Sequence, residues 1–363
     1  MSGYNVAVVG ATGLVGETMM QILAQREFPV DRLHAVASER SVGKTVEFGE
    51  RQVAVEALND FDFSGMHFAL FSAGAGTAIE HAPRAAAQGA IVIDNSSAFR
   101  YDHDVPLVVP EVNPSALAQC RERGIVANPN CSTIQLVVAL KPLYDAIGIQ
   151  RISVATYQAV SGAGRQAMED LVRHTADMMA GKGRPEEPAD AEEAEPPANG
   201  GQLPAMSAPS AAFNAVPHID DFQANGYTKE EMKMVWETRK ILDDEELRIS
   251  ATAVRVPVFF GHSEAVSVEL KRKVAVDEAL RLFRAARGVV VMSQDRAGGY
   301  PTPGIDASRS DAVFVGRVRE DISHEQGLSF WVVADNVRKG AALNAVQIAE
   351  LLIRDDASGQ ARG

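Results

Sequence analysis

Cys131 is the residue whose type and position most directly suggest chemistry. It lies in the segment 128–133, Asn-Pro-Asn-Cys-Ser-Thr, and an apolar run over 134–140 follows it. Proline, asparagine and serine are typical of turns and helix starts, so we expect Cys131 at or near a helix N-terminus. The partial positive charge there lowers a thiol pKa from its usual value near ~8.5 and favours the nucleophilic thiolate. A buried structural cysteine is the alternative that this segment alone leaves open.

A glycine-rich turn over 10–16, Gly-Ala-Thr-Gly-Leu-Val-Gly, is the second segment with chemical meaning. It follows an apolar strand over 4–9 and precedes a helical pattern with Met19, Met20, Ile22 and Leu23 on one side. Strand, glycine-rich turn and helix form the context of a dinucleotide-binding loop, whose backbone N–H groups approach a pyrophosphate. The spacing is GxxGxxG instead of GxGxxG, so the position of the turn carries much of the argument. A turn that serves only packing is the alternative.

The next predicted strand, 33–37, bears on the choice of cofactor because Glu39 and Arg40 follow it, flanked by serines. An acidic residue here accepts the ribose hydroxyls of NAD, whereas an arginine pairs with the 2′-phosphate of NADP. Arg40 beside Ser41 favours NADP. An ordinary surface charge is the alternative for Arg40.

Further strands over 68–71 and 90–93, separated by a helix over 78–88, continue this alternation. Repeated strand–helix units predict an N-terminal, Rossmann-type, doubly wound parallel sheet that binds ligands along the strand ends. Ser72 lies where a cofactor should pass. Arg100 follows at the same edge, either as an anion clamp or as a surface charge.

Beyond Cys131 the pattern becomes that of an α+β domain with a mixed sheet. We expect strands over 151–160, 247–258, 265–270, 289–292, 312–318 and 330–334, and a closing helix over 341–353. His262 lies at a glycine-marked corner with no apolar face to fill.

Three more helices are expected in this second part, one of them over 276–287. The helix over 166–180 has Met168, Leu171, Val172 and Met178 on its core side. The helix over 230–242 is rich in charges, which are usually a solvated face.

Composition limits the possible functions. A chain of 363 residues is long enough for two domains, and its net charge of -13 argues against nucleic acid. No apolar run approaches the ~20 residues of a membrane span, and the chain enters its first strand without a signal peptide. Two cysteines without metal-ligand spacing suit a reducing cytoplasm and give no reason to expect a metal. The acidic, proline-rich stretch 185–204 has the composition of a solvated insertion.

In this order, these residues resemble the aspartate-β-semialdehyde dehydrogenase family over nearly the whole chain. The most specific segments are 128–133 and Arg-Val-Pro at 255–257 followed by Gly-His-Ser-Glu at 261–264. The supporting segments are 10–13, Gln158 with 161–162, 231–233, 335–336 and 339–342. The insertion 185–204 departs from the family pattern and bears on the oligomer surface more than on the chemistry.

The resemblance implies roles for individual residues. Cys131 becomes the acyl-carrying nucleophile and His262 the acid/base. The substrate and phosphate site would consist of Arg100, Asn130, Gln158, Glu231, Lys233 and Arg255. The resemblance also implies contacts with NADP, and the glycine-rich turn and the strand ends add further ones. Together these residues are Gly10, Thr12, Gly13, Leu14, Val15, Arg40, Ser41, Ser72, Ser161, Gly162 and Asn336. The NADP-binding domain would span 1–127 with the C-terminal helix 337–363, and the catalytic and dimerisation domain would span 128–336.

The implied reaction is the reversible, NADPH-dependent reductive dephosphorylation of L-aspartyl-4-phosphate to L-aspartate-4-semialdehyde, in lysine, threonine and methionine biosynthesis. His262 would take the proton from Cys131, whose thiolate attacks the acyl carbon to form a thioester. Phosphate would leave toward Arg100 and Lys233, while Arg255 and Glu231 hold the α-carboxylate and ammonium. A cytoplasmic homodimer or homotetramer is implied.

Two other functions remain open. N-acetyl-γ-glutamyl-phosphate reductase shares fold, cofactor and thioester chemistry, but its substrate has no free ammonium and would not need Glu231. A catalytically silent dinucleotide-binding protein would need neither Cys131 nor His262.

Overall fold

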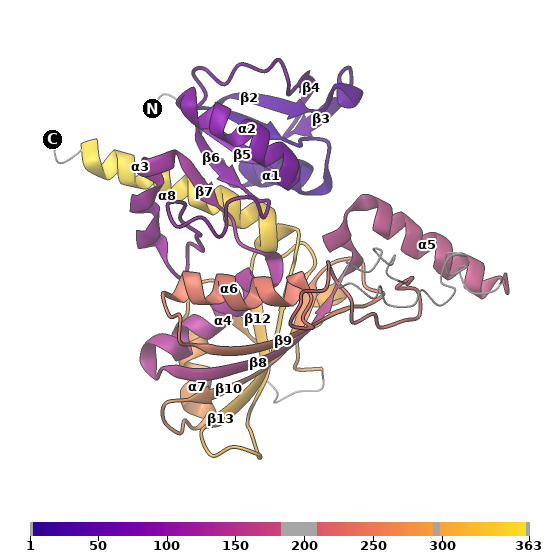
Figure 1. The fold of residues 1–363 in the computed structure, drawn as a ribbon, viewed down its shortest axis with the longest axis vertical. Helices are drawn as coiled ribbons and strands as arrows, with labels where there is room; N and C mark the ends of the chain where they lie inside the picture. Colours follow the sequence, from indigo (N-terminus) through magenta and orange to yellow (C-terminus); the bar gives the residue numbers. More distant parts are fainter. Residues whose placement is uncertain (1–2, 183–208, 293–297, 361–363) are drawn as a thin grey trace.

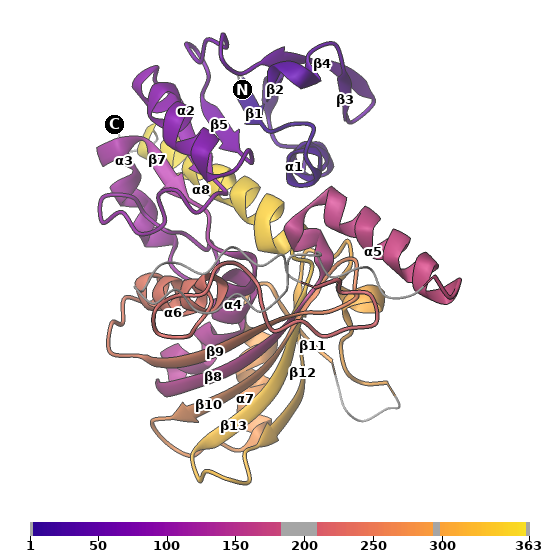
Figure 2. The same ribbon diagram turned by 45° about the vertical axis from the view of Figure 1, so that its right-hand side comes forward.

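The computed structural model describes residues 3–182, 209–292 and 298–360. Two β-sheets with their helices lie one above the other, and the C-terminal helix runs along the upper one (Figures 1 and 2). The predicted insertion 185–204 lies outside the described residues. Within the described ranges, no helix has both the length and the apolar character needed to cross a membrane.

The first sheet has seven strands in the order β3-β4-β2-β1-β5-β6-β7. All adjacent pairs are parallel except the edge pair β3–β4, which confirms the Rossmann-type prediction. The strands are β1 (Tyr4–Val9), β2 (Val30–Ala37), β3 (Thr45–Phe48), β4 (Arg51–Ala57), β5 (Phe68–Phe71), β6 (Ile91–Asp94) and β7 (Ile125–Ala127). The sequence analysis did not anticipate β3, β4 and β7.

Helix α1 (Leu14–Gln25) begins directly after the glycine-rich turn and covers this sheet. Its predicted inner residues Met19, Met20, Ile22 and Leu23 are all buried, as expected from their helical spacing. They share one apolar cluster with residues of α8 (Leu343–Gln360), so the end of the chain completes the core of its beginning.

The second sheet has six strands in the order β11-β12-β13-β10-β8-β9. It is mixed, as predicted: β8 runs parallel to β9 and antiparallel to β10. The strands are β8 (Ile149–Gln158), β9 (Arg248–Arg255), β10 (His262–Leu270), β11 (Val289–Val291), β12 (Val313–Glu320) and β13 (Gly327–Ala334). The helices α4 (Cys131–Ala146), α6 (Lys229–Leu242) and α7 (Val276–Ala285) pack against this sheet.

The remaining elements connect these layers. They are α2 (Ala75–Ala87), α3 (Cys120–Arg123), α5 (Arg165–Met179) and the short helical turns Glu39–Ser41, Pro114–Gln119, Val160–Ala163, Pro303–Ala307 and Arg338–Ala342.

Helix α5 corrects one prediction. Leu171 is buried, and Met168 and Met178 are partly buried against the same small cluster, but Val172 is 57% exposed. Figures 1 and 2 show that α5 leans away from both sheets, and among the described residues only a narrow stripe of it packs against an apolar cluster. The predicted core role of Val172 is therefore wrong.

Helix α6 corrects a second prediction. Its Glu230, Glu231 and Glu237 are buried, although charged residues at these positions were expected to form a solvated face. A buried carboxylate needs hydrogen-bonding partners, and each of these glutamates has them. These partners lie in other elements, which a pattern within one helix does not reveal.

Candidate active site

Cys131 is the first residue of α4, which confirms the predicted helix start. The side chain of Asn130 caps this helix: its Oδ1 accepts the N–H groups of Ser132 at 3.0 Å and Thr133 at 3.3 Å. The apolar residues of the following turns are buried, which fixes the helix and therefore the sulfur.

His262 lies opposite Cys131, with its Nε2 at 3.2 Å from the sulfur. It is the first residue of β10 and is completely buried. The backbone N–H of Ala159 donates to its Nδ1 at 3.0 Å, so the neutral ring carries its proton on Nε2. Burial and the nearby Arg255 hold the pKa of His262 well below its usual range, which keeps the ring neutral.

The pKa of Cys131 differs from the sequence-based prediction. Burial, followed by the charge of Glu230, raises the pKa of Cys131 to about 12. The cations Arg255 and Arg100 act in the opposite direction but do not outweigh burial. The predicted lowering is wrong because the helix terminus is only one of the influences on this thiol. The second cysteine, Cys120, is buried in an apolar cluster without catalytic neighbours.

A cavity of about 370 Å³ opens beside Cys131. The predicted residues that line it are Val15, Arg100, Asn130, Cys131, Gln158, Ser161, Gly162, Lys233, Arg255 and Asn336. They come from both ends of the chain and from both sheets, so the fold brings the two predicted halves of the site together.

Arg100 reaches this cavity from the loop after β6 and is buried. Its Nε donates to the carbonyl of Asn128 and its Nη2 to that of Asn95, both at 2.9 Å, and its Nη1 donates to Glu237 at 3.0 Å. Lys233 lies on α6 with its Nζ 2.7 Å from Asp220 and 3.0 Å from Glu230. Two cations therefore face the space beside the sulfur, which suits an anionic group such as phosphate.

Arg255 and Gln158 end the adjacent strands β9 and β8. Arg255 donates from Nη1 to the carbonyl of Ala159 at 2.8 Å, and Gln158 donates from Nε2 to Glu230 at 3.2 Å. Burial alone would raise the pKa of Glu230, but Lys233 and the hydrogen bonds to this carboxyl bring the pKa below its usual range. Glu230 is therefore an ionised carboxylate in the cavity wall.

A second cavity, of about 540 Å³, lies along the glycine-rich turn. Its walls include the predicted cofactor residues Gly10, Thr12, Gly13, Arg40 and Ser72. Helix α1 has no side-chain cap at its start, so its first N–H groups remain available to an anion.

Backbone crowding fixes the shape of this turn. A Cβ on Gly10, whose φ is 86°, would lie 2.7 Å from the carbonyl oxygen of Ser72. A Cβ on Gly16 would lie 2.2 Å from the carbonyl oxygen of Gly10. The turn therefore requires glycine, and its backbone fits the pyrophosphate of a dinucleotide.

The remaining predicted cofactor residues lie outside this second cavity. Val15, Ser161, Gly162 and Asn336 line the first cavity, where Asn336 donates to Ser161 Oγ at 3.0 Å. Ser41 contacts Thr12 through their hydroxyls at 3.3 Å. Leu14, the first residue of α1, lines neither cavity.

Comparison with known proteins agrees with this geometry. The family model "Semialdehyde dehydrogenase, NAD binding domain" matches residues 5–120, and "Semialdehyde dehydrogenase, dimerisation domain" matches residues 140–339. An aspartate-semialdehyde dehydrogenase of Legionella pneumophila is 53% identical over 97% of this chain and 96% of its own length. The chain belongs to the aspartate-semialdehyde dehydrogenase family.

Two solved members of the family share the fold. The Vibrio cholerae aspartate semialdehyde dehydrogenase II complexed with ASA matches with a TM-score of 0.89 and 52% identity, over 98% of this chain and 99% of that one. The Candida albicans enzyme with NADP matches with a TM-score of 0.71 and 26% identity, over 97% and 98% of the two chains.

Within this semialdehyde dehydrogenase scaffold, Glu231 does not lie where the sequence analysis expected it. Its Oε2 accepts the N–H of Thr228 at 2.7 Å and its Oε1 accepts the N–H of Ala253 at 2.9 Å. Thr228 and Glu231 form a capping box at the start of α6, so this carboxylate faces the backbone. Its neighbour Glu230 lines the cavity instead. The Thr-x-x-Glu spacing is a sequence signal that distinguishes the two residues.

The sequence analysis also missed residues around the sulfur. A Cβ on Gly340 would lie 2.8 Å from the Cβ of Cys131, so only glycine permits this close approach of the C-terminal segment. Asn95 and Asn128 provide backbone carbonyls to Arg100. The side chain of Asn128 donates from Nδ2 to Oδ1 of Asn95 at 2.5 Å. Asn128 and Gly340 lie in the segments 128–133 and 339–342 that carry the family resemblance, but no pattern within these segments indicated their contacts.

Proposed function

We propose that this protein catalyses the reversible, NADPH-dependent reductive dephosphorylation of L-aspartyl-4-phosphate to L-aspartate-4-semialdehyde, in lysine, threonine and methionine biosynthesis. The observation that carries the proposal is the 3.2 Å contact between Cys131 and His262 at the wall of a cavity that also presents Arg100, Lys233 and Arg255. The 52% identical Vibrio cholerae relative complexed with ASA supports the same substrate.

Each charged residue of the cavity would bind one charged group of the substrate. Arg255 would bind the α-carboxylate through the N–H groups that it does not donate to Ala159. Glu230, in place of Glu231, would hold the ammonium, with Asn130 and Gln158 fixing its carboxylate. Arg100 and Lys233 would take the phosphate. An amino acid with an acyl phosphate needs all three kinds of contact.

In the first chemical step, the bond between the acyl carbon and a phosphate oxygen breaks, and a bond between the acyl carbon and the sulfur forms. Cys131 attacks as the nucleophile, and its thiol proton leaves with the phosphate as HPO₄²⁻, which balances the step without an external base. His262 carries its proton on Nε2, so we assign it as the donor that stabilises the oxyanion and, later, the released sulfur. This differs from the expectation that His262 takes the proton from Cys131.

NADPH, when bound, supplies the hydride that reduces the thioester. The first N–H groups of α1, at 14 and 15, would hold the pyrophosphate, with Gly10, Thr12 and Ser72 forming the wall, whereas the N–H of Gly13 donates to the carbonyl of Gly10. Arg40, with Ser41 beside it, would pair with the 2′-phosphate. Ser161, Gly162 and Asn336 line the cavity that contains Cys131 and would hold the cofactor end nearest the sulfur.

Phosphate-dependent reduction of NADP⁺ in the presence of aspartate 4-semialdehyde tests this function. We expect activity that requires all three compounds, with N-acetylglutamate 5-semialdehyde at least about 100-fold poorer, because Glu230 would lose its ammonium partner. Preference for the acetylated substrate would favour the reductase alternative. Binding of NADP⁺ without turnover of either aldehyde would favour a silent dinucleotide-binding protein.

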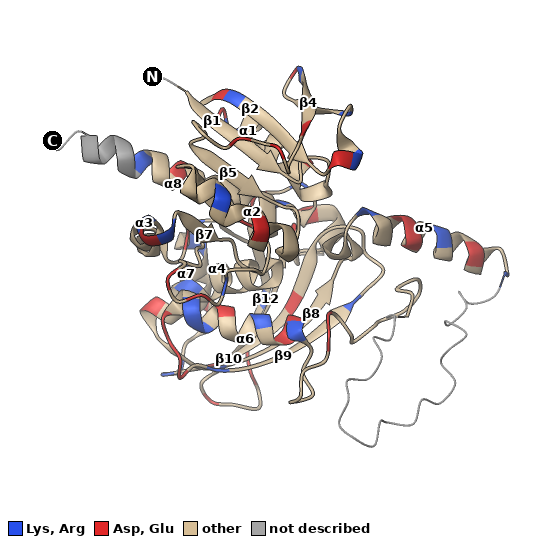
Figure 3. Cartoon of the chain, turned by 45° about the horizontal axis from the view of Figure 1, so that its top comes forward, with Lys and Arg blue, Asp and Glu red and all other residues tan. Residues whose placement is uncertain are grey.

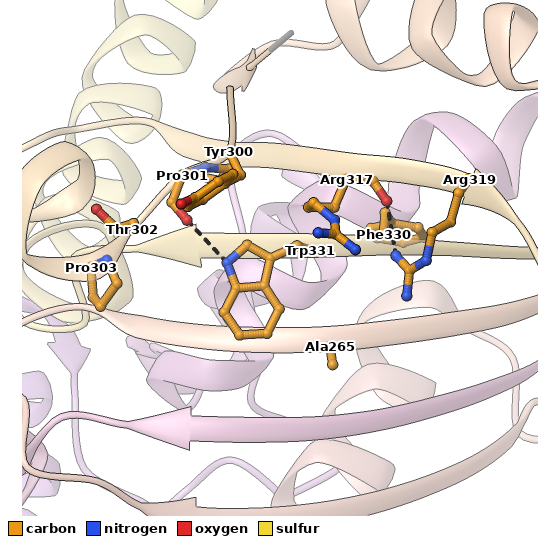
Figure 4. A pocket seen from close by; sticks show the side chains of 9 residues that line it. All are labelled: Ala265, Tyr300, Pro301, Thr302, Pro303, Arg317, Arg319, Phe330 and Trp331. Atoms are coloured by element: carbon orange, nitrogen blue, oxygen red, sulfur yellow. Dashed lines mark hydrogen bonds between the residues drawn. The ribbon is translucent and has the colours of Figure 1, made fainter. Parts of the chain in front are cut away.

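The domain division and the assembly are part of the proposal. We propose a cofactor domain of 1–127 with 337–363, supported by the shared core of α1 and α8, and a catalytic and dimerisation domain of 128–336. The uncovered face of the second sheet would join two subunits. An apolar groove of about 400 Å³ lies there. Figure 4 shows Tyr300, Pro301 and Trp331 among the side chains that line it. A homodimer, alone or paired into a homotetramer, in the cytoplasm would follow.

A further inference from the structure

Four of the charged residues of helix α6 lie at spacings that place them along one face: Glu230, Lys233, Glu237 and Lys240. Figure 3 shows acidic and basic residues following each other along this helix. Glu230 and Lys233 line the cavity beside Cys131. Glu237 and Lys240 do not line it.

Glu237 bridges two parts of the site that are far apart in the sequence. It is completely buried, with 0% of its surface exposed. Its Oε1 accepts from Nη1 of Arg100 at 3.0 Å, and its Oε2 accepts from the backbone N–H of Asn130 at 2.6 Å. One carboxylate therefore holds both the proposed phosphate arginine and the residue that caps the Cys131 helix.

Lys240 holds the loop that carries the arginine. Its Nζ donates to the backbone carbonyls of Arg100 at 2.9 Å, Asp102 at 2.6 Å and Val105 at 2.9 Å. An ammonium has three N–H donors, and all three are used here. The loop after β6 is thus fixed to α6 by its backbone as well as by the Arg100 side chain.

These bonds leave Arg100 one orientation. Of its five N–H groups, one on each of its three nitrogens is directed at Glu237, Asn95 or Asn128, so the remaining two lie on Nη1 and Nη2. Two remaining donors on a fixed guanidinium, one on each terminal nitrogen, can bind the oxygens of a phosphate. The position of that pair relative to the sulfur depends on Glu237, because Glu237 also holds the start of the cysteine helix.

We propose that Glu237 is a positioning residue that, together with Lys240, fixes the position of the Arg100 guanidinium relative to the start of the Cys131 helix. This relative position, here called the register, places the departing or attacking phosphate. This inference rests on the proposed function. Glutamine at 237 could satisfy only one of the two donors, since its amide NH₂ would face the other. Loss of the register would weaken phosphate binding before it affected the cofactor cavity.

The test compares Glu237→Gln and Lys240→Gln with the control Glu246→Gln, which removes an exposed carboxylate just beyond α6. Apparent KM values for phosphate, NADP⁺ and aspartate 4-semialdehyde are measured in the phosphate-dependent direction. We expect the phosphate KM to rise at least about tenfold for Glu237→Gln and by a smaller factor for Lys240→Gln, since a charged hydrogen bond of about 1.5 kcal/mol corresponds to that factor. The other two KM values should stay within twofold, and the control should match the unmodified protein.

A second readout needs no turnover. Phosphate should protect Cys131 from iodoacetamide in the unmodified protein, and about ten times more phosphate should be needed in Glu237→Gln. An unchanged phosphate requirement, or an equal rise of all three KM values, would overturn the proposal. If Glu237→Gln does not fold, Lys240→Gln decides by the same criteria. Loss of turnover in the unmodified protein, with the protection pattern intact, would instead contradict the proposed function.

Discussion

The two cavities of this protein are built in different ways. Around Cys131 the walls are buried charged side chains such as Arg100, Glu230 and Lys233, each held by partners from other elements. Along the glycine-rich turn part of the wall is the backbone of that turn, at Gly10 and Gly13, and Arg40 is an exposed side chain without an ion pair among the described residues. A site made of backbone can be encoded in a short segment. A site made of side chains depends on the complete fold.

The largest effect should come from removing the nucleophile. Cys131→Ala should lower turnover at least about 10⁴-fold, because no other side chain can form the thioester. The NADP⁺ dissociation constant, measured by fluorescence titration, should remain within twofold, because the cofactor cavity is formed by another part of the chain. Retained turnover would contradict the nucleophile assignment, and lost NADP⁺ binding would show that the two cavities are not independent.

The reverse experiment breaks the backbone-built cavity. Gly16→Ala places a Cβ 2.2 Å from the carbonyl of Gly10, so the turn must shift, and NADP⁺ affinity should fall about 100-fold. The alkylation rate of Cys131 by iodoacetamide should stay within twofold. Gly76→Ala is the matched control, because a Cβ on this helical glycine meets nothing within 4 Å. Equal losses in both variants would mean that crowding at Gly16 is not the cause.

The same contrast explains what could be predicted from the sequence. The β1–turn–α1 unit and the helix start at Cys131 were predicted correctly, because their signals are apolar periodicity and capping within a few residues. The strands β3 and β4 were missed because they carry exposed charged residues, and β7 was missed because it has only three residues.

The errors at the catalytic cavity have a different origin. Glu230 and Glu231 are adjacent, and only the cap at Thr228 decides which of them faces the cavity. The pKa of Cys131 depends on burial by distant elements, whereas a helix terminus is visible locally. Contacts such as that of Gly340 with Cys131 join residues more than two hundred positions apart, and no single segment contains their signal.

A smaller effect is expected at the exposed end of the cofactor cavity. Arg40→Ala should weaken NADP⁺ binding by roughly tenfold or more, since one charged hydrogen bond to phosphate contributes about 1.5–3 kcal/mol. NAD⁺ binding should change by less than twofold, because NAD⁺ has no 2′-phosphate. Titration of both cofactors into both proteins measures the ratio. An equal loss of affinity for NADP⁺ and NAD⁺ would mean that Arg40 stabilises the fold of the turn and does not bind the 2′-phosphate.

The smallest effect concerns two buried carboxylates of the catalytic domain. Glu230 has three partners, whereas Gln135 is the one polar side chain that favours the charge of Glu264 in β10 among the described residues, and no well-aligned hydrogen bond reaches either oxygen of Glu264 there. Burial raises the pKa of Glu264 well above its usual range, so just above that range the folded protein keeps a proton on this carboxyl that the unfolded chain has released. Stability from this group is therefore present at low pH and lost as pH rises.

Glu264→Gln keeps the neutral shape and removes this loss. The difference in unfolding free energy between Glu264→Gln and the unmodified protein should grow in favour of the variant as pH rises above the usual carboxyl range, by up to about 1.4 kcal/mol per pH unit, for example between pH ~5 and ~7. Urea unfolding at the two pH values measures it, and Glu246→Gln, which alters an exposed carboxylate, should show no such change. A difference that stays constant with pH would mean that Glu264 is ionised in the folded protein, and both carboxylates would then be held as charges.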